Sequence, residues 1–268
     1  MQTVKLGSIK EHSYTMKESL RALKTNLQFC GDDVNAILIT SSVPDEGKST
    51  VTMNLARSLT ESGKSVLVID TDMRKSVLIG RLRARSHEGE LYGLSHYLSG
   101  QKKLDEVVYA TDVKRLFMVF AGPSVPNPTE ILEKKYFETM MEFARGHFDY
   151  VLLDCAPIGA AIDAAVIAKH CDGAILVISQ GVASSRLINN IKGQLERSGV
   201  RILGAVLNKV QMKKSGYGYG YGYGYGYGYG YGYYGGEDEK GLAELKPVSE
   251  DDEDEAKKSV KKKSSRKK

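Results

Sequence analysis

Residues 36–50 of this chain read AILITSSVPDEGKST. The first five residues form an apolar run that predicts a buried strand, and residues 51–62, VTMNLARSLTES, fit a helix. Between them lies a loop of the form GxxxxGK[ST], in which Ser42 stands in place of the first glycine. Because a loop between a strand and a helix N-terminus directs backbone N–H groups toward an anion, this order predicts a phosphate-binding loop.

The residue types in this loop suit a nucleoside triphosphate with its metal ion. Gly47 lets the backbone approach the phosphates, Lys48 supplies positive charge to the β- and γ-phosphates, and the Ser49 hydroxyl is a ligand for Mg²⁺. We therefore expect ATP and Mg²⁺ as cofactors. The expected nucleotide-binding residues in the loop are Pro44, Asp45, Glu46, Gly47, Lys48, Ser49 and Thr50.

Apolar runs rich in β-branched residues alternate along the chain with segments that fit helices. The six runs lie at 36–40, 66–70, 116–121, 150–154, 174–179 and 202–208. None alternates apolar with polar residues, which is typical of strands buried on both faces of a parallel sheet. Asn127 and Pro128 mark a helix start as N-cap and first helical residue, and 187–195 carries an apolar residue at every fourth position. The order predicts a doubly wound, mostly parallel α/β sheet with P-loop NTPase architecture.

Carboxylates follow two of these strands, at the edge where such sheets bind ligands. Asp70 and Asp72 come at the end of the second run, and Asp154 ends the fourth. An aspartate at a strand end beside a P-loop is the Walker B arrangement, in which the carboxylate holds Mg²⁺ directly or through water. Asp70 and Asp72 project to the same side of the strand end, so either can be the general base or a metal ligand. The expected metal ligands are Ser49, Asp70, Asp72 and Asp154, and the expected catalytic residues are Lys48, Asp70, Asp72 and Asp154.

Two further side chains near these strand ends each allow two interpretations. Arg74 either touches the nucleotide or pairs with a carboxylate. Asn208, which ends the last strand, either contacts adenine or closes a turn. Both residues are therefore candidates for nucleotide binding.

The composition changes sharply after Gln211. Gly and Tyr alternate through residues 216–236, residues 250–255 are six acids in a row, and eight of the last twelve residues are Lys or Arg. A Gly-rich repeat without aliphatic residues and long blocks of like charge do not form a packed core. We therefore expect a P-loop domain at 1–211, a Tyr/Gly-rich segment at 212–236, and a disordered tail, first acidic and then Lys-rich, at 237–268.

The net charge of +5 does not indicate a nucleic-acid partner. Residues 212–268 hold 12 basic and 10 acidic residues, a net of +2, which leaves the body of the chain near neutral at +3. The Lys-rich terminus either binds anionic lipid headgroups or only aids solubility. Three cysteines without CxxC spacing, no apolar run of about 18 residues, and an N-terminus without an apolar signal region favour the cytoplasm.

The motifs together resemble those of a known family. The loop VPDEGKST at 43–50, the DTDMR sequence at 70–74 and YVLLDCAP at 150–157 look like the bacterial tyrosine kinases of capsule and exopolysaccharide synthesis. The tyrosine-rich segment strengthens the resemblance, which covers roughly residues 14–211. An N-terminal helical segment adds a further match to the family's ExxRxxR ring-assembly motif.

This N-terminal motif consists of Glu18, Arg21 and Lys24, and Lys24 stands where the family has its last arginine. A lysine cannot form the bidentate fork of an arginine, so the contact that it makes is weaker. From spacing alone, the three residues fit an exposed charged helix face with i,i+3 pairing. The resemblance instead implies a contact between subunits of an oligomer.

The resemblance implies an ATP- and Mg²⁺-dependent protein-tyrosine kinase that phosphorylates its own C-terminal tyrosines and other proteins. It also implies a role in regulating capsular or exopolysaccharide synthesis and export. The implied partners are further copies of this chain in a ring, a separate membrane-spanning chain-length adaptor that recruits the kinase to the inner face of the membrane, and a phosphotyrosine phosphatase. The expected autophosphorylation sites are Tyr217, Tyr219, Tyr221, Tyr223, Tyr225, Tyr227, Tyr229, Tyr231, Tyr233 and Tyr234.

Two other functions compete with this interpretation. A division-site or chromosome-partition ATPase without kinase activity has the same expected fold, but such enzymes usually carry an extra lysine about where Val43 stands here. A non-enzymatic scaffold would use the Tyr/Gly repeat either for aromatic contacts, as a sticker, or to bind single-stranded RNA by stacking. The repeat lacks interleaved Arg or Lys, which disfavours this third function.

Overall fold

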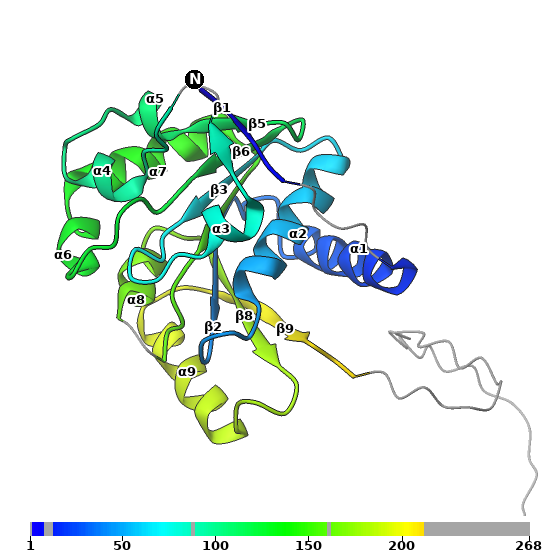
Figure 1. Cartoon of the computed structure of the whole chain (residues 1–268). Coiled ribbons are helices and arrows are strands. Elements are labelled where there is room, and N and C mark those ends of the chain that lie inside the picture. Colours follow the sequence, from blue (N-terminus) through cyan, green and yellow to red (C-terminus); the bar gives the residue numbers. More distant parts are fainter. Residues whose placement is uncertain (1, 8–12, 87–88, 160–161, 212–268) are drawn as a thin grey trace, which may run out of the picture. The chain divides into compact units, whose positions relative to one another are not determined.

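A nine-stranded sheet organises the chain in the computed structural model, which describes residues 2–7, 13–86, 89–159 and 162–211 (Figure 1). These residues fall within one unit of the chain, 1–214. The expected Tyr/Gly-rich segment and charged tail lie outside the described residues, so the division at Gln211 stays a prediction.

The strands follow the order β4-β1-β5-β6-β3-β7-β2-β8-β9 across the sheet. Every neighbouring pair is parallel except β4–β1 and β5–β6. The strands are β1 (Gln2–Lys5), β2 (Ala36–Ser41), β3 (Val66–Asp70), β4 (Arg85–Ser86), β5 (Tyr109–Thr111), β6 (Leu116–Val119), β7 (Tyr150–Asp154), β8 (Gly173–Ser179) and β9 (Ile202–Asn208). The predicted doubly wound, mostly parallel α/β sheet is therefore confirmed.

Helices cover both faces of this sheet (Figure 1). They are α1 (Tyr14–Gln28), α2 (Lys48–Glu61), α3 (Leu78–Leu82), α4 (Leu94–Leu98), α5 (Leu104–Val107), α6 (Pro128–Leu132), α7 (Lys135–His147), α8 (Asp163–Ala168) and α9 (Ser185–Arg197). Among the residues that the structure describes, no helix combines the length and the apolar character needed to cross a membrane.

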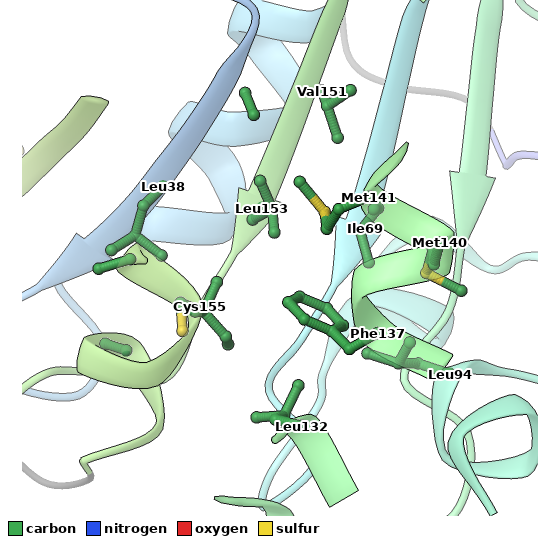
Figure 2. Close-up of a cluster of buried hydrophobic side chains, with 14 of the residues drawn as sticks. Leu38, Ile69, Leu94, Leu132, Phe137, Met140, Met141, Val151, Leu153 and Cys155 are labelled. Atoms are coloured by element: carbon green, nitrogen blue, oxygen red, sulfur yellow. The ribbon is translucent and has the colours of Figure 1, made fainter. Parts of the chain in front are cut away.

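Successive residues of the central strands point into two separate cores. On β2, Leu38 lies in one core, whereas Ile37 and Ile39 lie in the other. Leu38 shares its core with Phe137 of α7 and Leu132 of α6, and Figure 2 shows this cluster. The second core takes residues from α1, α2 and α3. Because both faces of β2 are covered by helices, its residues from Ala36 to Ile39 are all apolar, which is why the sequence predicts a buried strand there.

Two local predictions differ from the structure. The expected strand at 116–121 ends at Val119, because the carbonyl oxygens of Phe120 and Ala121 accept hydrogen bonds from the start of α4. Pro128 is the first residue of α6 as predicted, but Asn127 does not cap the helix with its side chain. Instead, the Asn127 amide donates to Glu130 Oε1 at 3.0 Å.

Candidate nucleotide-binding and catalytic site

The P-loop joins the end of β2 to the first turn of α2, where the sequence predicted it. Gly47 adopts a φ of +96°, a left-handed conformation that glycine tolerates without strain. A Cβ atom at this position would lie 2.2 Å from Asn208 Nδ2, so a larger residue would also displace the end of β9. Helix α2 begins directly afterwards at Lys48. The glycine is therefore required both by the turn and by the close approach of β9.

The side chain of Glu46 lies inside the loop and is buried. Its Oε2 atom accepts hydrogen bonds from the backbone N–H groups of Ser42 (2.7 Å) and Val43 (2.9 Å) and from the Ser42 hydroxyl. Its Oε1 atom accepts from the N–H of Ser179, at the end of β8, at 3.0 Å. Glu46 thus fixes the shape of the loop with its carboxylate, a contact that loop spacing alone did not indicate.

The ammonium group of Lys48 lies among the predicted carboxylates. Its Nζ atom is 3.2 Å from Asp72 Oδ2 and 3.7 Å from Asp154 Oδ1, and it donates to Ser49 Oγ at 3.4 Å. Burial opposes the charge of Lys48, but the carboxylates of Asp154 and Asp72 outweigh burial and raise its pKa. The structure therefore brings together the predicted lysine, serine and two of the three aspartates.

Asp70 lies in the same buried group and is held by its own loop. Its carboxylate accepts hydrogen bonds from the Ser76 hydroxyl and, at 3.2 Å, from the backbone N–H of Asp72. Burial, together with the nearby Asp154 carboxylate, raises the pKa of Asp70 to about 7. Burial likewise raises the pKa of Asp154, against the opposing charge of Lys48. Such raised pKa values are typical of functional sites, where buried carboxyl groups lie close to one another.

The donor set at this position suits magnesium. Asp154 Oδ1 is buried and accepts no hydrogen bond among the described residues, although Lys48 Nζ lies 3.7 Å away, so this oxygen keeps the capacity to bind a metal ion. Within the same residues, no group of three or more His, Cys, Asp or Glu side chains converges into a metal site of its own. Mg²⁺ usually takes only one or two carboxylates and completes its shell with water and phosphate oxygens. The residues therefore fit a metal ion that arrives with a nucleotide.

Arg74 makes a bidentate ion pair with a carboxylate, which is one of the two roles that we predicted for it from the sequence. Its Nε donates to Asp163 Oδ2 at 2.7 Å, and a terminal guanidinium nitrogen donates to Asp163 Oδ1 at 3.0 Å. The Thr129 hydroxyl donates to the same carboxylate at 2.7 Å. Burial acts to raise the pKa of Asp163, but these hydrogen bonds outweigh burial and lower it. No local pattern indicated that Asp163 and Thr129 contact Arg74, because each lies far along the chain from it.

Asn208 ends β9 beside the P-loop. Its Nδ2 atom donates to the carbonyl oxygen of Glu46 at 2.8 Å. This contact explains why Asn208 lies at the site, and a contact with adenine stays a prediction. The remaining predicted loop residues Pro44, Asp45 and Thr50 occupy the loop and the first turn of α2.

The N-terminal motif lies on α1, away from the carboxylates. Glu18 and Arg21 form an i,i+3 ion pair on an exposed face, with 43% and 67% of their side chains accessible. Lys24 turns instead toward α2 and donates to the Ser62 hydroxyl at its end. Glu18 and Arg21 are therefore accessible to a partner, whereas Lys24 is engaged within the subunit. The ten predicted autophosphorylation tyrosines lie outside the described residues.

The parallel sheet, the P-loop after β2 and the carboxylates around Lys48 define a P-loop ATPase fold. A family model described as an AAA domain matches residues 34–192. The tyrosine-protein kinase CpsD of Streptococcus agalactiae serotype III is 41% identical over 201 residues, which cover 75% of this chain and 85% of that protein. The kinase domain of the Escherichia coli tyrosine kinase ETK superposes with a TM-score of 0.69 at 28% identity, over 83% of this chain and 94% of that one. The chain belongs to the bacterial tyrosine-protein kinases.

The fold is also shared with a division-site protein. The septum site-determining protein MinD from Pyrococcus horikoshii, solved with Mg-ADP, superposes with a TM-score of 0.55 at 25% identity. That alignment covers 65% of this chain and 69% of the other. A division-site ATPase, the alternative that we considered from the sequence, therefore has the same fold. The ETK kinase domain matches a larger share of this chain, with a higher TM-score.

Proposed function

We propose that this protein is an ATP- and Mg²⁺-dependent autokinase that phosphorylates the tyrosine cluster of its own C-terminal segment. The observation that supports this most directly is the position of Lys48, which lies against Asp72 and Asp154 at the first turn of α2. The described chain ends at Gln211, only a few residues before the first tyrosine of the repeat, Tyr217. The active site and its substrate are therefore part of one chain.

The proposed binding contacts follow from the loop. The backbone from Pro44 to Thr50 surrounds the phosphates, and Lys48 places its charge on the β- and γ-phosphate oxygens. Ser49 and Asp154 would hold Mg²⁺, which would supply positive charge to the phosphate oxygens. Asn208 lies beside this loop, Arg74 pairs with Asp163, and both stay candidates for direct nucleotide contact.

The proposed reaction joins a tyrosine oxygen to the γ-phosphorus of ATP and breaks the bond from that phosphorus to the ADP oxygen. The tyrosine hydroxyl, with a pKa of about 10, gives its proton to Asp70 or Asp72 as the new bond forms. Both carboxylates lie in the buried group around Lys48. Asp70→Asn and Asp72→Asn, compared in single-turnover assays, distinguish the base from the residue that only completes the metal shell.

The proposed biological role is the regulation of capsular or exopolysaccharide synthesis and export. The exposed Glu18–Arg21 pair on α1 supports assembly into a ring of identical subunits. By resemblance to the family, a separate membrane-spanning adaptor recruits the kinase from the cytoplasm to the inner face of the membrane. A phosphotyrosine phosphatase would reverse the modification.

One experiment separates this function from its alternative. The purified full-length protein is incubated with MgATP, and its intact mass and phosphotyrosine content are measured over time. Stepwise mass gains confined to the C-terminal segment support the autokinase. Hydrolysis of ATP without phosphotyrosine would instead identify a partition- or division-site ATPase.

A further inference from the structure

Two side chains at the end of β9 bind the backbone of the P-loop. Asn208 Nδ2 donates to the carbonyl oxygen of Glu46 at 2.8 Å. Lys209 Nζ donates to the carbonyl oxygen of Asp45. The two carbonyl groups belong to the two residues that precede Gly47, and Gly47 is the N-cap residue of α2. These contacts join the end of the last described strand to the part of the loop that leads into α2.

The geometry of a trans peptide gives these contacts a directional effect. In a planar trans peptide, the C=O and N–H groups point in opposite directions. The carbonyl of Glu46 shares its peptide with the N–H of Gly47, and the carbonyl of Asp45 shares its peptide with the N–H of Glu46. When Asn208 and Lys209 hold the two carbonyls toward β9, the two N–H groups are turned away from β9 and into the loop.

These two N–H groups are available for a ligand. Within the part of the chain that the structure describes, neither the N–H of Glu46 nor that of Gly47 donates a hydrogen bond to another residue. The loop also needs an external restraint, because Asp45 and Gly47 both have positive φ values, of 63° and 96°. A left-handed conformation costs a non-glycine residue such as Asp45 about 1 kcal/mol. Contacts from outside the loop offset this cost.

The same end of β9 is the root of the C-terminal segment. The backbone N–H of Gln180 donates to the carbonyl oxygen of Asn208 at 3.0 Å. The N–H of Gln211 in turn donates to the Gln180 side chain at 2.9 Å. Residues 208–211 are thus bonded to the P-loop on one side and to the end of β8 on the other.

We propose that Asn208 and Lys209 are positioning residues that aim the N–H groups of Gly47 and Glu46 at the nucleotide phosphates. Through them, phosphate binding at the loop orders residues 208–211, the root of the tyrosine-bearing segment. Coupling of this kind is reciprocal, so loosening the root weakens nucleotide binding by the same factor. The regulatory meaning of this coupling rests on the proposed autokinase function, whereas the coupling itself does not.

The first test measures binding to the phosphates alone. Full-length Asn208→Ala and Lys209→Met proteins are titrated with a fluorescent ADP analogue in Mg²⁺, which is then displaced by ADP or by inorganic tripolyphosphate. Loss of one such hydrogen bond corresponds to a weakening of about 3- to 10-fold. We expect this loss for tripolyphosphate as well as for ADP, because the contact acts through the loop. Loss confined to ADP would show an adenine contact instead and would overturn the proposal.

Matched variants control for general damage to the fold. Lys209→Arg keeps a donor and is expected to bind both ligands within about 2-fold of wild type. Lys192→Met removes an exposed lysine that pairs with Glu196 on α9, and it should leave both affinities unchanged. If Asn208→Ala unfolds, comparison of Lys209→Met with Lys209→Arg still tests the proposal. Equal binding by Lys209→Met and wild type would reject the role of Lys209.

The second test measures the root directly by hydrogen–deuterium exchange. In wild type, MgADP should slow exchange in the peptide that contains residues 208–211, and in Asn208→Ala this protection should be lost while protection of the P-loop peptide persists. Protection of the P-loop without any change at the root of the wild type would refute the coupling. Absence of phosphotyrosine in the kinase assay would refute the autokinase function and leave these binding results intact.

Discussion

Asp70 of β3 and Asp154 of β7 lie directly opposite each other across two neighbouring parallel strands. Each carboxylate is buried, and each has a raised pKa because burial disfavours its charge. Asp72 adds a third carboxylate close by, and Lys48 is the cation that lies against this group in the structure. The raised pKa values of Asp70 and Asp154 show that Lys48 does not fully offset the cost of charging this group, so a further cation bound here would favour the charged carboxylates.

Lys48→Met is expected to abolish phosphotyrosine formation, with a loss of about 100-fold or more in rate. The variant lacks the positive charge of the ammonium group that stabilises the transferred phosphate. Asp154→Asn should have nearly the same effect by weakening Mg²⁺. Intact-mass measurement after MgATP incubation checks both. Lys64→Met is the matched control, since Lys64 pairs with Asp149 on the surface away from the P-loop. Labelling at the wild-type rate in Lys48→Met would disprove the assigned site.

The Arg74–Asp163 pair is expected to contribute to folding stability. Among the described residues, Arg74→Ala leaves the buried Asp163 with the Thr129 hydroxyl as its only side-chain hydrogen-bond partner. Urea denaturation of Arg74→Ala, Asp163→Asn and the double variant should give a coupling energy of about 1–3 kcal/mol. Additive effects of the two substitutions would show that the ion pair contributes nothing. A raised KM for ATP at unchanged stability would instead indicate that Arg74 touches the nucleotide.

The acid limb of the stability curve should depend on Asp172. Its carboxylate accepts hydrogen bonds from Arg145 and from the backbone N–H groups of Asn35 and Ala36, at 2.8 to 3.0 Å. Burial opposes the charge, but these bonds outweigh burial and lower the pKa of Asp172. A lowered pKa in the folded state stabilises the protein above the unfolded pKa, and this stability is lost as the pH falls below about 4.

Asp172→Asn is therefore expected to cost about 1–3 kcal/mol at pH 7 and progressively less as the pH falls below about 4. Urea denaturation at several pH values measures the difference from wild type. Asp105→Asn, on the short helix α5, serves as a carboxylate control. A cost for Asp172→Asn that is the same at pH 7 and pH 3 would contradict the assigned role of its charge.

Delivery of the tyrosines should depend on tethering more than on recognition of single sites. Five residues separate Gln211 from Tyr217, and nine separate it from Tyr221 in the sequence count. A Gly-rich linker of about ten residues would span roughly 15–20 Å and hold a tethered group at up to millimolar effective concentration. Replacing any one tyrosine of the repeat with Phe should therefore change the labelling rate little, whereas replacing all ten should remove most label. A single tyrosine that proves indispensable in the mass measurements would argue against tethering.

Arg21→Ala should weaken the oligomer if the exposed face of α1 binds a neighbouring subunit. Sedimentation of the variant should then show a lower mass than wild type. A Lys48→Met subunit mixed with a tail-deleted active subunit should become labelled in trans, and Arg21→Ala should reduce that labelling. An Arg21→Ala protein that stays oligomeric and still labels in trans would reject this interface.

The sequence predicted the central strands well because their signal is local. Val66–Asp70 and Tyr150–Asp154 form as predicted, since burial on both faces requires a continuous apolar run. β1 and β4 were not predicted, because they lie toward one edge of the sheet and are short and largely polar. Such strands form through pairing with distant residues, and a local pattern of residue types does not carry that information.

In the candidate site too, some features were predicted from the sequence and others were not. Lys48, Asp72 and Asp154 were predicted, because a P-loop and strand-end carboxylates have fixed spacing or a fixed position relative to strands. The contact of Asp163 with Arg74 and the internal hydrogen bonds of Glu46 were not predicted. Both depend on side chains that meet only in the folded chain, and many acidic residues of this sequence would have fitted as partners.

The position of β2 in the sheet also sets the order of events during synthesis. Ala36 pairs with Val151 of β7, and Leu38 pairs with Ala174 of β8, so the strand that leads into the P-loop has no neighbours until most of the domain has been translated. Long-range pairing of this kind is slow, and domains fold as units while they leave the ribosome. A nascent chain is therefore unable to bind ATP early. Because the tyrosine repeat follows β9 in the sequence, it leaves the ribosome after every strand of the sheet has been synthesised.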